Sequence, residues 1–341
     1  MSELQIMNKV LLSSALILGL FLPSPSARTQ TKGTLLAVNQ NDVTLSIIDP
    51  VTSKQTGLIQ EDGQIKAHEV AASPDGKTAY LPIYGSAGVG HAGTDGREML
   101  VIDLPSRKIV KVVDFGHGVR PHKPVYDTHR NILYVTTELD QSITAIDPTT
   151  FKILYSIPTG QAESHMLALS HDGRFGYTAN VGPGTVSVLD LDSHQTVAVI
   201  PVARHIQRIA ISNDDMTVFV SDATAPRLAA IDTASHTVRS WIDLPAKGYG
   251  GAVSKDGQYL LLALPAAKQV GVINLATMKL EKTIDVPASP QEVLLSPDGK
   301  EAFVSCNTSS KIAEINTADW TVTQLLPAGM WVDGLAWSTW R

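Results

Sequence analysis

Short apolar runs separated by tight polar turns dominate the chain, and one stretch shows the pattern clearly. Within residues 290–327, four such runs are separated by a Ser-Pro-Asp-Gly turn at residues 296–299 and by two further polar breaks. The runs end at Leu295, Cys306, Asn316 and Leu326. Runs of this length bounded by turn residues predict β-strands, here a four-stranded antiparallel sheet. One such sheet cannot bury both of its faces alone, so copies of it must stack.

Copies of this unit recur along the whole chain. The third run of each copy ends in an apolar residue followed by Asp or Asn, at Asp49, Asp103, Asp147, Asp190, Asp232, Asn274 and Asn316. Turns of the Ser-x-Asp-Gly type begin at Ser73, Ser170, Ser212, Ser254 and Ser296, and residues 127–131 form a divergent sixth. Asp and Gly suit tight turns, so we interpret these aspartates as structural. Seven copies at a period of about 42 residues predict an all-β, seven-bladed β-propeller with four antiparallel strands per blade.

The two ends of the repeat region predict how the ring closes. Residues 34–38 match the second strand of a repeat, and residues 334–340 match a first strand. The C-terminal strand should therefore complete the N-terminal blade, which leaves no open sheet edge between the two ends.

The repeats resemble a known family. The runs Ser73–Tyr80 (Ser-Pro-Asp-Gly-Lys-x-x-Tyr), Leu133–Thr136 (Leu-Tyr-Val-Thr) and Thr185–Asp190 (Thr-Val-Ser-Val-Leu-Asp) are similar to the YVTN β-propeller repeat family, which includes YncE-like exported proteins. The resemblance covers residues 33–340 and implies a seven-bladed propeller. Related propellers include lactonases, copper or haem oxidoreductases and binding modules, so the resemblance does not choose the chemistry.

Composition and the N-terminus indicate an exported single-domain protein. The chain has 341 residues, is 43% hydrophobic and carries a net charge of −6. Residues 8–9 precede an apolar run, residues 10–22, and small residues follow at 24–27, as in a secretory signal peptide. We therefore expect a signal peptide at 1–27, one propeller domain at 28–341, a periplasmic or secreted location, no stable membrane span after cleavage, and a monomer. Cys306 has no cysteine partner in the chain, so packing and sheet closure must provide stability.

One repeat contains a long glycine-rich insertion. Residues 85–98 make the connection between the second and third runs of the second repeat about ten residues longer than in its siblings. In a meander this connection lies on the same side as the start of the first strand. The insertion and its His91 should therefore lie over the same face as the starts of the inner strands, where a long loop can act as a lid.

A register count from the Ser-x-Asp-Gly turns indicates a polar ring near the mouth of the central channel. The residue five positions before each turn serine, or its equivalent, is polar in every blade. These ring positions are His68, His122, His165, Gln207, Tyr249, Gln291 and Asp333. We predict that the ring binds a ligand, together with Arg120, Arg208 and His91. The alternative is that the ring only satisfies backbone groups and channel waters.

Three ring positions in consecutive blades are histidines. His68, His122 and His165 could coordinate zinc or copper, with an open position for water or substrate. Glu69, Glu163 and Asp333 are candidate supporting residues. Cationic residues gather on the same side of the repeats, so an anionic small molecule is a candidate ligand. The alternative is that these cations are ordinary solvated loop residues with no ligand.

Three functions remain open from the sequence. The first is an exported ligand-binding or interaction module that uses the face at the channel mouth. The second is an enzyme, either a lactonase-like hydrolase or a metal-dependent oxidoreductase, in which Arg120 or Arg208 would hold a substrate carboxylate. The sequence contains no Gly-x-Ser-x-Gly elbow, no Cys-x-x-Cys-His haem site and no His-Glu-x-x-His motif. Nucleic-acid binding is the third and is disfavoured by the acidic net charge.

Overall fold

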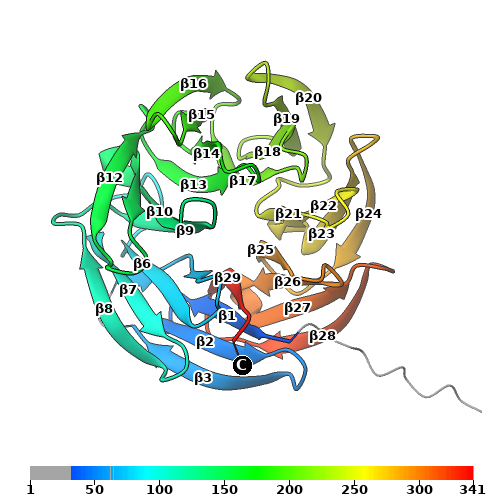
Figure 1. The fold of residues 1–341 in the computed structure, drawn as a ribbon. Coiled ribbons are helices and arrows are strands. Elements are labelled where there is room, and N and C mark those ends of the chain that lie inside the picture. The colour runs from blue at the N-terminus through cyan, green and yellow to red at the C-terminus, as the bar shows by residue number, and fades with distance from the viewer. Residues whose placement is uncertain (1–31, 62, 64, 341) are drawn as a thin grey trace, which may run out of the picture. The chain divides into compact units, whose positions relative to one another are not determined.

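The computed structural model describes residues 32–61, 63 and 65–340, which form a ring of antiparallel sheets around a central axis (Figure 1). The described residues form seven sheets, one per predicted repeat; six are meanders of four strands, and in the sheet of blade 2 the inner strand is divided into two short strands. Neighbouring innermost strands contact one another around the ring, for example β9 with β13 and β13 with β17. The predicted seven-bladed propeller is confirmed.

Blades 1 to 3 contain the first strands of the chain and its last strand. Blade 1 comprises β29 (Val332–Ser338), β1 (Thr34–Asn39), β2 (Thr44–Asp49) and β3 (Lys54–Gln60). Blade 2 comprises β4 (Lys66–Ala67) and β5 (Ala71–Ala72), which together make its inner strand, then β6 (Thr78–Gly85), β7 (Asp95–Asp103) and β8 (Lys108–Asp114). Blade 3 comprises β9 (Pro121–Asp127), β10 (Ile132–Thr137), β11 (Ser142–Ile146) and β12 (Ile153–Pro158).

Blades 4 to 7 are the more regular copies. Blade 4 comprises β13 (Ser164–Leu169), β14 (Phe175–Asn180), β15 (Thr185–Asp190) and β16 (Gln195–Pro201). Blade 5 comprises β17 (Ile206–Ile211), β18 (Thr217–Asp222), β19 (Arg227–Asp232) and β20 (Thr237–Asp243). Blade 6 comprises β21 (Gly251–Val253), β22 (Tyr259–Leu264), β23 (Gln269–Asn274) and β24 (Lys279–Asp285), and blade 7 comprises β25 (Pro290–Leu295), β26 (Glu301–Cys306), β27 (Lys311–Asn316) and β28 (Thr321–Pro327). Single-turn 3-10 helices η1 (Glu138–Asp140), η2 (Pro265–Ala267) and η3 (Asn307–Ser309) join second and third strands.

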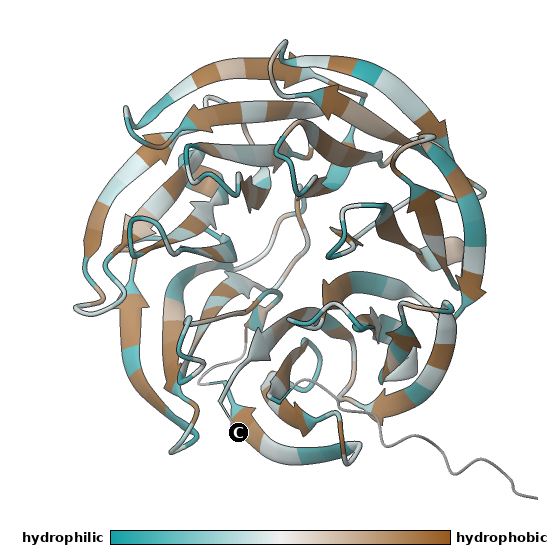
Figure 2. Ribbon diagram, turned by 45° about the vertical axis from the view of Figure 1, so that its right-hand side comes forward, coloured by the Kyte–Doolittle hydropathy of each residue, from teal (hydrophilic) through white to brown (hydrophobic). Residues whose placement is uncertain are grey.

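Burial follows the order of strands within a blade. The second and third strands are buried almost throughout, because neighbouring blades cover both of their faces. The fourth strands form the rim and alternate between exposed and partly buried residues. Hydrophilic and hydrophobic bands likewise alternate along the outer ribbons of Figure 2. This arrangement explains why the middle runs of each repeat are the most apolar.

The Ser-x-Asp-Gly turns are structural, as predicted. In each of the five, the serine hydroxyl donates a hydrogen bond to the aspartate carboxylate two residues later, at 2.6–2.9 Å. In four of the turns the fourth residue is a glycine whose φ angle is near +75°, within the left-handed region. These residues are Gly76, Gly173, Gly257 and Gly299. The turn in blade 5 has Asp215 at this position instead, with φ of 58°.

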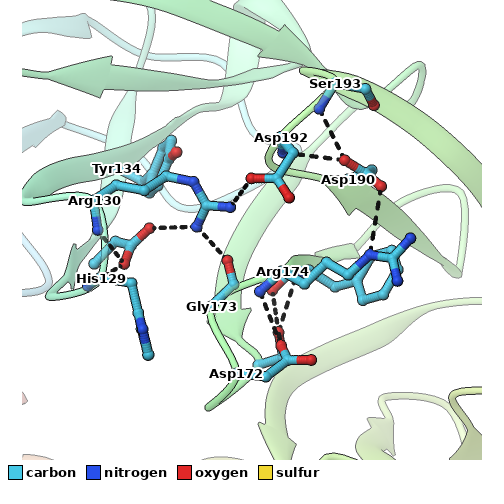
Figure 3. A network of polar contacts seen from close by, with 12 residues as sticks. His129, Arg130, Tyr134, Asp172, Gly173, Arg174, Asp190, Asp192 and Ser193 are labelled. Carbon is cyan, nitrogen blue, oxygen red and sulfur yellow. Dashed lines mark hydrogen bonds and ion pairs between the residues drawn. The ribbon is translucent and has the colours of Figure 1, made fainter.

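Turns of neighbouring blades also contact one another on this side of the ring. Between blades 3 and 4, the Arg130 guanidinium contacts Asp127, Asp192 and the carbonyl of Gly173 (Figure 3). His129 Nε2 lies 2.9 Å from the carbonyl of His171. The side chain of His129 and the backbone of His171 thus join blades 3 and 4.

The C-terminal strand closes the ring. β29 pairs antiparallel with β1, so that Leu35 lies opposite Trp337 and Thr34 opposite Ser338. The Trp337 ring stacks on Phe303 of blade 7 at 5.6 Å between centroids. The predicted closure is therefore confirmed, and the last strand contacts both neighbouring blades.

The sequence also led to predictions about a signal peptide, a membrane span and Cys306. The proposed signal peptide at residues 1–27 lies outside the described residues. Within the part that the structure describes, no helix is long and apolar enough to cross a membrane. Cys306 is fully buried, and burial raises the pKa of its thiol to about 12, so it is an unreactive core residue.

Candidate functional site

The three predicted histidines lie together at one side of the channel. His122 in β9 and His165 in β13 stack with their ring centroids 3.6 Å apart. His68 contacts them from blade 2, with its centroid 5.5 Å from that of His122. We call His68, His122 and His165 the histidine cluster.

The inner strand of blade 2 differs from the sequence-based expectation. It is interrupted between β4 and β5, so that His68 lies outside a regular strand. The carbonyl of His68 accepts a hydrogen bond from the backbone of Gly334 in blade 1, at 2.9 Å. A backbone contact between blades thus replaces part of the ladder within the blade and holds His68 at the channel.

Tyr84 and Glu138 complete the surroundings of the histidine cluster. The Tyr84 ring lies 4.7–5.5 Å from all three imidazoles, and its hydroxyl donates to Glu138 Oε2 at 2.9 Å. His165 Nδ1 lies 2.8 Å from the same carboxylate oxygen. Glu138 is 1% exposed, so this carboxylate is held inside the protein between two donors.

Sequence reasoning missed Glu138 and named Glu69, Glu163 and Asp333 as supporting residues instead. Glu138 is the first residue of η1, in the connection between the second and third strands of blade 3. The equivalent residues of the other blades are Gln40, Ser86, Val181, Ala223, Pro265 and Asn307. Only blade 3 has a carboxylate there, on the same side as the histidines, and that difference was the available signal.

The hydrogen bonds of the cluster define which ring nitrogens carry protons. His122 Nδ1 lies 3.1 Å from the carbonyl oxygen of His165, and His165 Nδ1 faces the Glu138 carboxylate. Both partners are acceptors, so each Nδ1 carries a hydrogen. In the neutral ring, Nε2 of each histidine then keeps its lone pair for a ligand.

Burial also keeps two of the histidines neutral. It lowers the pKa of His68 to about 3, with a further electrostatic contribution from the neighbouring His165. Burial likewise holds the pKa of His122 well below its usual range. Both rings are therefore uncharged at neutral pH, which is the state that binds a metal centre.

The expected zinc or copper site at His68, His122 and His165 is not supported by the arrangement of side chains. Among the residues that the structure describes, no group of three or more His, Cys, Asp or Glu side chains could hold a metal ion. The stacked rings and the Glu138 hydrogen bond account for this outcome, because they direct the histidines toward protein partners as well as toward the channel.

The other ring positions do not join the histidines. The Tyr249 ring lies beside the Arg208 guanidinium, 4.9 Å from centroid to Cζ, and Gln207 accepts a hydrogen bond from the backbone of Arg208. Gln291 contributes its carbonyl, which accepts from the backbone of Gly250 at 3.0 Å. Asp333 pairs with Arg208. The predicted ring is therefore split into a histidine side and a charged side.

A buried group of charges crosses the channel, at the ring position of blade 1 and one residue after the ring positions of blades 2, 3, 5 and 7. Arg208 in β17 contacts Glu69 of blade 2 at 2.5 Å and Asp333 of blade 1 at 3.0 Å, and it also pairs with Glu292 of blade 7. Lys123 in β9 pairs with Glu69 at 2.7 Å and with Glu292 at 3.3 Å. We call Glu69, Lys123, Arg208, Glu292 and Asp333 the charge cluster. Because its members come from five blades, these contacts span the channel.

The contacts within the charge cluster show that the two cations at the channel, Lys123 and Arg208, are paired with carboxylates of the protein. Burial alone would raise the pKa of Glu69, but Arg208 and Lys123 hold it at about 2. Burial raises the pKa of Asp333 to about 7 despite its contact with Arg208. Two cations face three carboxylates, so Arg208 has protein partners already and is not the free anchor for a substrate carboxylate that the sequence indicated.

Arg120 is also engaged by the protein. Its Nε donates to Asp95 at 2.6 Å and its Nη2 donates to the carbonyl of His91 at 2.8 Å. Nη1 lies 3.8 Å from Glu138 Oε1. Arg120 was predicted to hold a substrate carboxylate, but its guanidinium already has protein partners. It connects the long insertion to Glu138 beside the histidine cluster. The insertion lies on the same side as the cluster, as the connectivity predicted.

Comparison with known families decides the relationship of the chain. A family profile described as "Cytochrome D1 heme domain" matches residues 126–319, more than half of the chain. The chain belongs to the cytochrome D1 heme domain family. The resemblance to YVTN propellers is thus confirmed only at the level of the fold.

Solved structures add further support for the fold. The propeller is similar to "Kuenenia stuttgartiensis Hydrazine Synthase", with a TM-score of 0.70 and 18% sequence identity over 87% of this chain and 99% of that chain. It is also similar to "Dihydro-heme d1 dehydrogenase NirN in complex with DHE", with a TM-score of 0.64 and 14% identity over 92% of this chain and 77% of that chain. A search of curated protein sequences gives no match.

Proposed function

We propose that this cytochrome D1 heme domain protein binds a haem-type tetrapyrrole at the histidine cluster and takes part in a redox process. The single observation that carries the proposal is the pair of stacked imidazoles, His122 and His165, in which each Nδ1 is anchored to a protein acceptor and each Nε2 is left for a ligand. The family is named for a haem, and the similar NirN protein is a dihydro-haem d1 dehydrogenase, so both support the choice of ligand class.

The donor set of the site fits a haem better than a bare metal ion. A haem iron takes four ligands from its own macrocycle, so one or two protein imidazoles suffice. The contact of Glu138 with His165 resembles the carboxylate–histidine pairs that orient metal ligands and raise their basicity. A bound haem supplies a redox-active iron, and the residues around it would set its ligation and its exclusion of water.

The charges around the site constrain how an acidic ligand could be held. Arg120, Lys123 and Arg208 have carboxylate partners, so they do not offer free positive charge. Arg204 and Lys247, at the starts of the inner strands of blades 5 and 6, are on the same side and reach solvent. An anionic group of the ligand would therefore meet these rim residues rather than the charge cluster.

The protein would act outside the cytoplasm. The positively charged Lys9, the apolar run after it and the small residues that follow have the features of a secretory signal peptide. A periplasmic location is compatible with a ligand-binding or redox role.

Titration with ferric protoporphyrin IX tests the proposal. The purified protein should shift and sharpen the Soret band with saturation at one equivalent, because a neutral imidazole ligates the iron. The variant with His68, His122 and His165 all replaced by Ala should lose this spectrum. Circular dichroism and thermal unfolding establish whether the variant keeps the fold.

A matched control uses histidines outside the cluster. His194 and His236 replaced by Ala should leave the titration unchanged, since both lie in turns on the opposite side of the blades. The proposal would be abandoned if the wild-type protein gave only the spectrum of free haem, or if the folded cluster variant bound as the wild type does.

A further inference from the structure

The insertion of blade 2 is an ordered hairpin rather than a loose loop. Its base is closed by the backbone of Ser86 donating to Thr94 at 3.0 Å and by the backbone of Thr94 donating to Ser86 Oγ at 2.8 Å. Near its tip, the backbone of His91 donates to the carbonyl of Gly88 at 3.1 Å. We call residues 86–94 the insertion loop.

The tip of the insertion loop lies against the starts of the strands that carry two of the clustered histidines. The carbonyl of His91 accepts from Arg120, two residues before His122. A side chain at Gly90 would lie 3.3 Å from Glu163 Oε1, two residues before His165. The loop therefore leaves blade 2, passes blade 3 and reaches blade 4 on the side of the channel where the cluster lies.

Arg120 connects the tip of the loop to the cluster itself. The residue adopts a left-handed backbone conformation, with φ of 50°, and its side chain is only 8% exposed. Its guanidinium contacts His91 and Asp95 on the loop side, and it faces Glu138 and the Tyr84 ring on the other. Glu138 in turn holds His165. The path from loop tip to cluster thus consists of two side chains, Arg120 and Glu138.

His91 is the residue on this loop with the chemistry to meet a ligand. It is exposed, and no described residue forms a hydrogen bond with its imidazole. The glycines around it, Gly88, Gly90 and Gly93, let the backbone adapt to a bound group. An unengaged imidazole on an anchored backbone can turn toward such a group at little cost.

We propose that the insertion loop forms the outer wall of the ligand site, that His91 supplies a second imidazole to a tetrapyrrole held at the histidine cluster, and that Arg120 is the positioning residue for His91. This inference rests on the proposed function. The ligand class is a planar, iron-containing macrocycle that is met on one side by the channel wall and on the other by the loop.

The test compares spin states with ferric protoporphyrin IX as the probe. The wild-type complex should be six-coordinate and low-spin by absorption and electron paramagnetic resonance. His91→Ala should still bind but should become high-spin, with a Kd about tenfold higher, and added imidazole should restore the low-spin spectrum. Arg120→Gln should give a mixture of the two states, because the loop loses its anchor while His91 remains.

Two controls isolate the loop from general effects of substitution. His117→Ala removes an exposed histidine of the same side that pairs with Asp140, and Arg97→Ala removes an exposed arginine that pairs with Asp114. Neither should change the spin state. A His91→Ala complex that stays low-spin overturns the inference while leaving the proposed function intact, whereas a wild-type protein that binds no haem overturns both.

Discussion

Burial decides the chemistry of individual residues at this channel. His68, His122 and Glu69 lie at neighbouring positions around the channel, yet the first two are kept neutral and the third is kept charged. The difference lies in their partners: His68 and His122 are surrounded by rings, while Glu69 contacts two cations. A polar residue at the channel therefore has no fixed role until its neighbours are known.

The low pKa of His68 leads to a prediction about pH. Its folded-state pKa of about 3 is below the value of about 6.5 for an unfolded chain, so its contribution to stability is present above pH 6.5 and is lost as the pH falls toward 3. In ¹⁵N-detected spectra, the His68 ring should stay neutral at pH 5, whereas histidines of the urea-unfolded protein titrate near 6.5.

Urea unfolding measures the same effect as a free energy. Between pH 7.5 and 5, the wild type should lose about 2 kcal/mol more stability than His68→Gln, which has no group to titrate at this position. Equal losses in the two proteins, or a His68 ring that is protonated at pH 5, would contradict the assignment of a buried neutral imidazole.

At two places, the backbones of neighbouring inner strands lie so close together that only glycine fits between them. A side chain at Gly250 would lie 2.3 Å from the carbonyl oxygen of Gln291, and one at Gly334 would lie 2.5 Å from the carbonyl oxygen of His68. These glycines occupy the register that holds charged residues in four other blades. At this register position, an inner strand can thus carry a charged side chain that reaches across the channel, or a glycine that lets two backbones come into contact.

Substitution of Gly334 tests this account of the strands. Gly334→Ala should lower the free energy of unfolding by about 1–3 kcal/mol, because the new methyl group overlaps the carbonyl of His68 and the backbone must shift. Gly88→Ala is the matched control, since its new side chain would meet only the edge of His91, at 4.0 Å. Urea denaturation of both variants provides the measurement, and equal stabilities would rule out the close approach of blades 1 and 2.

At the scale of the molecule, one strand joins the two ends of the ring. β29 supplies the backbone pairing to β1, the Trp337 stack on Phe303 and the Asp333 carboxylate of the charge cluster. Its removal would expose the edge of β1 and leave Arg208 with one fewer partner. The closure therefore affects the sheets and the channel together.

Truncation measures the value of this closure. A chain that ends at Met330 should have a melting temperature lower by about 10 °C or more, since several kilocalories per mole of packing and pairing are lost. A chain that ends at Trp340 serves as the control and should unfold like the full protein. A truncated protein with unchanged thermal unfolding would show that the ring holds without β29.

The sequence by itself determined the repeat, the strands and the closure, because each depends on residues that are close in the chain or on the match between its two ends. The run that ends at Cys306 was predicted as a strand and is β26, and the Ser-x-Asp-Gly turns have the hydrogen bonds that their residue types favour. The proximity of His68, His122 and His165 also followed from register, since equal positions in adjacent blades must lie side by side.

Only the tertiary structure decided which partners these residues have. The contact of Glu138 with His165 joins a loop of blade 3 to a strand of blade 4, and Arg208 reaches Glu69 across the channel. The repeat pattern does not specify such contacts, because they depend on the diameter of the ring and on the lengths of the side chains. The same geometry turned Arg120 and Arg208 from candidate ligand anchors into internal partners, and it left the histidine side of the channel as the place where a ligand can be proposed.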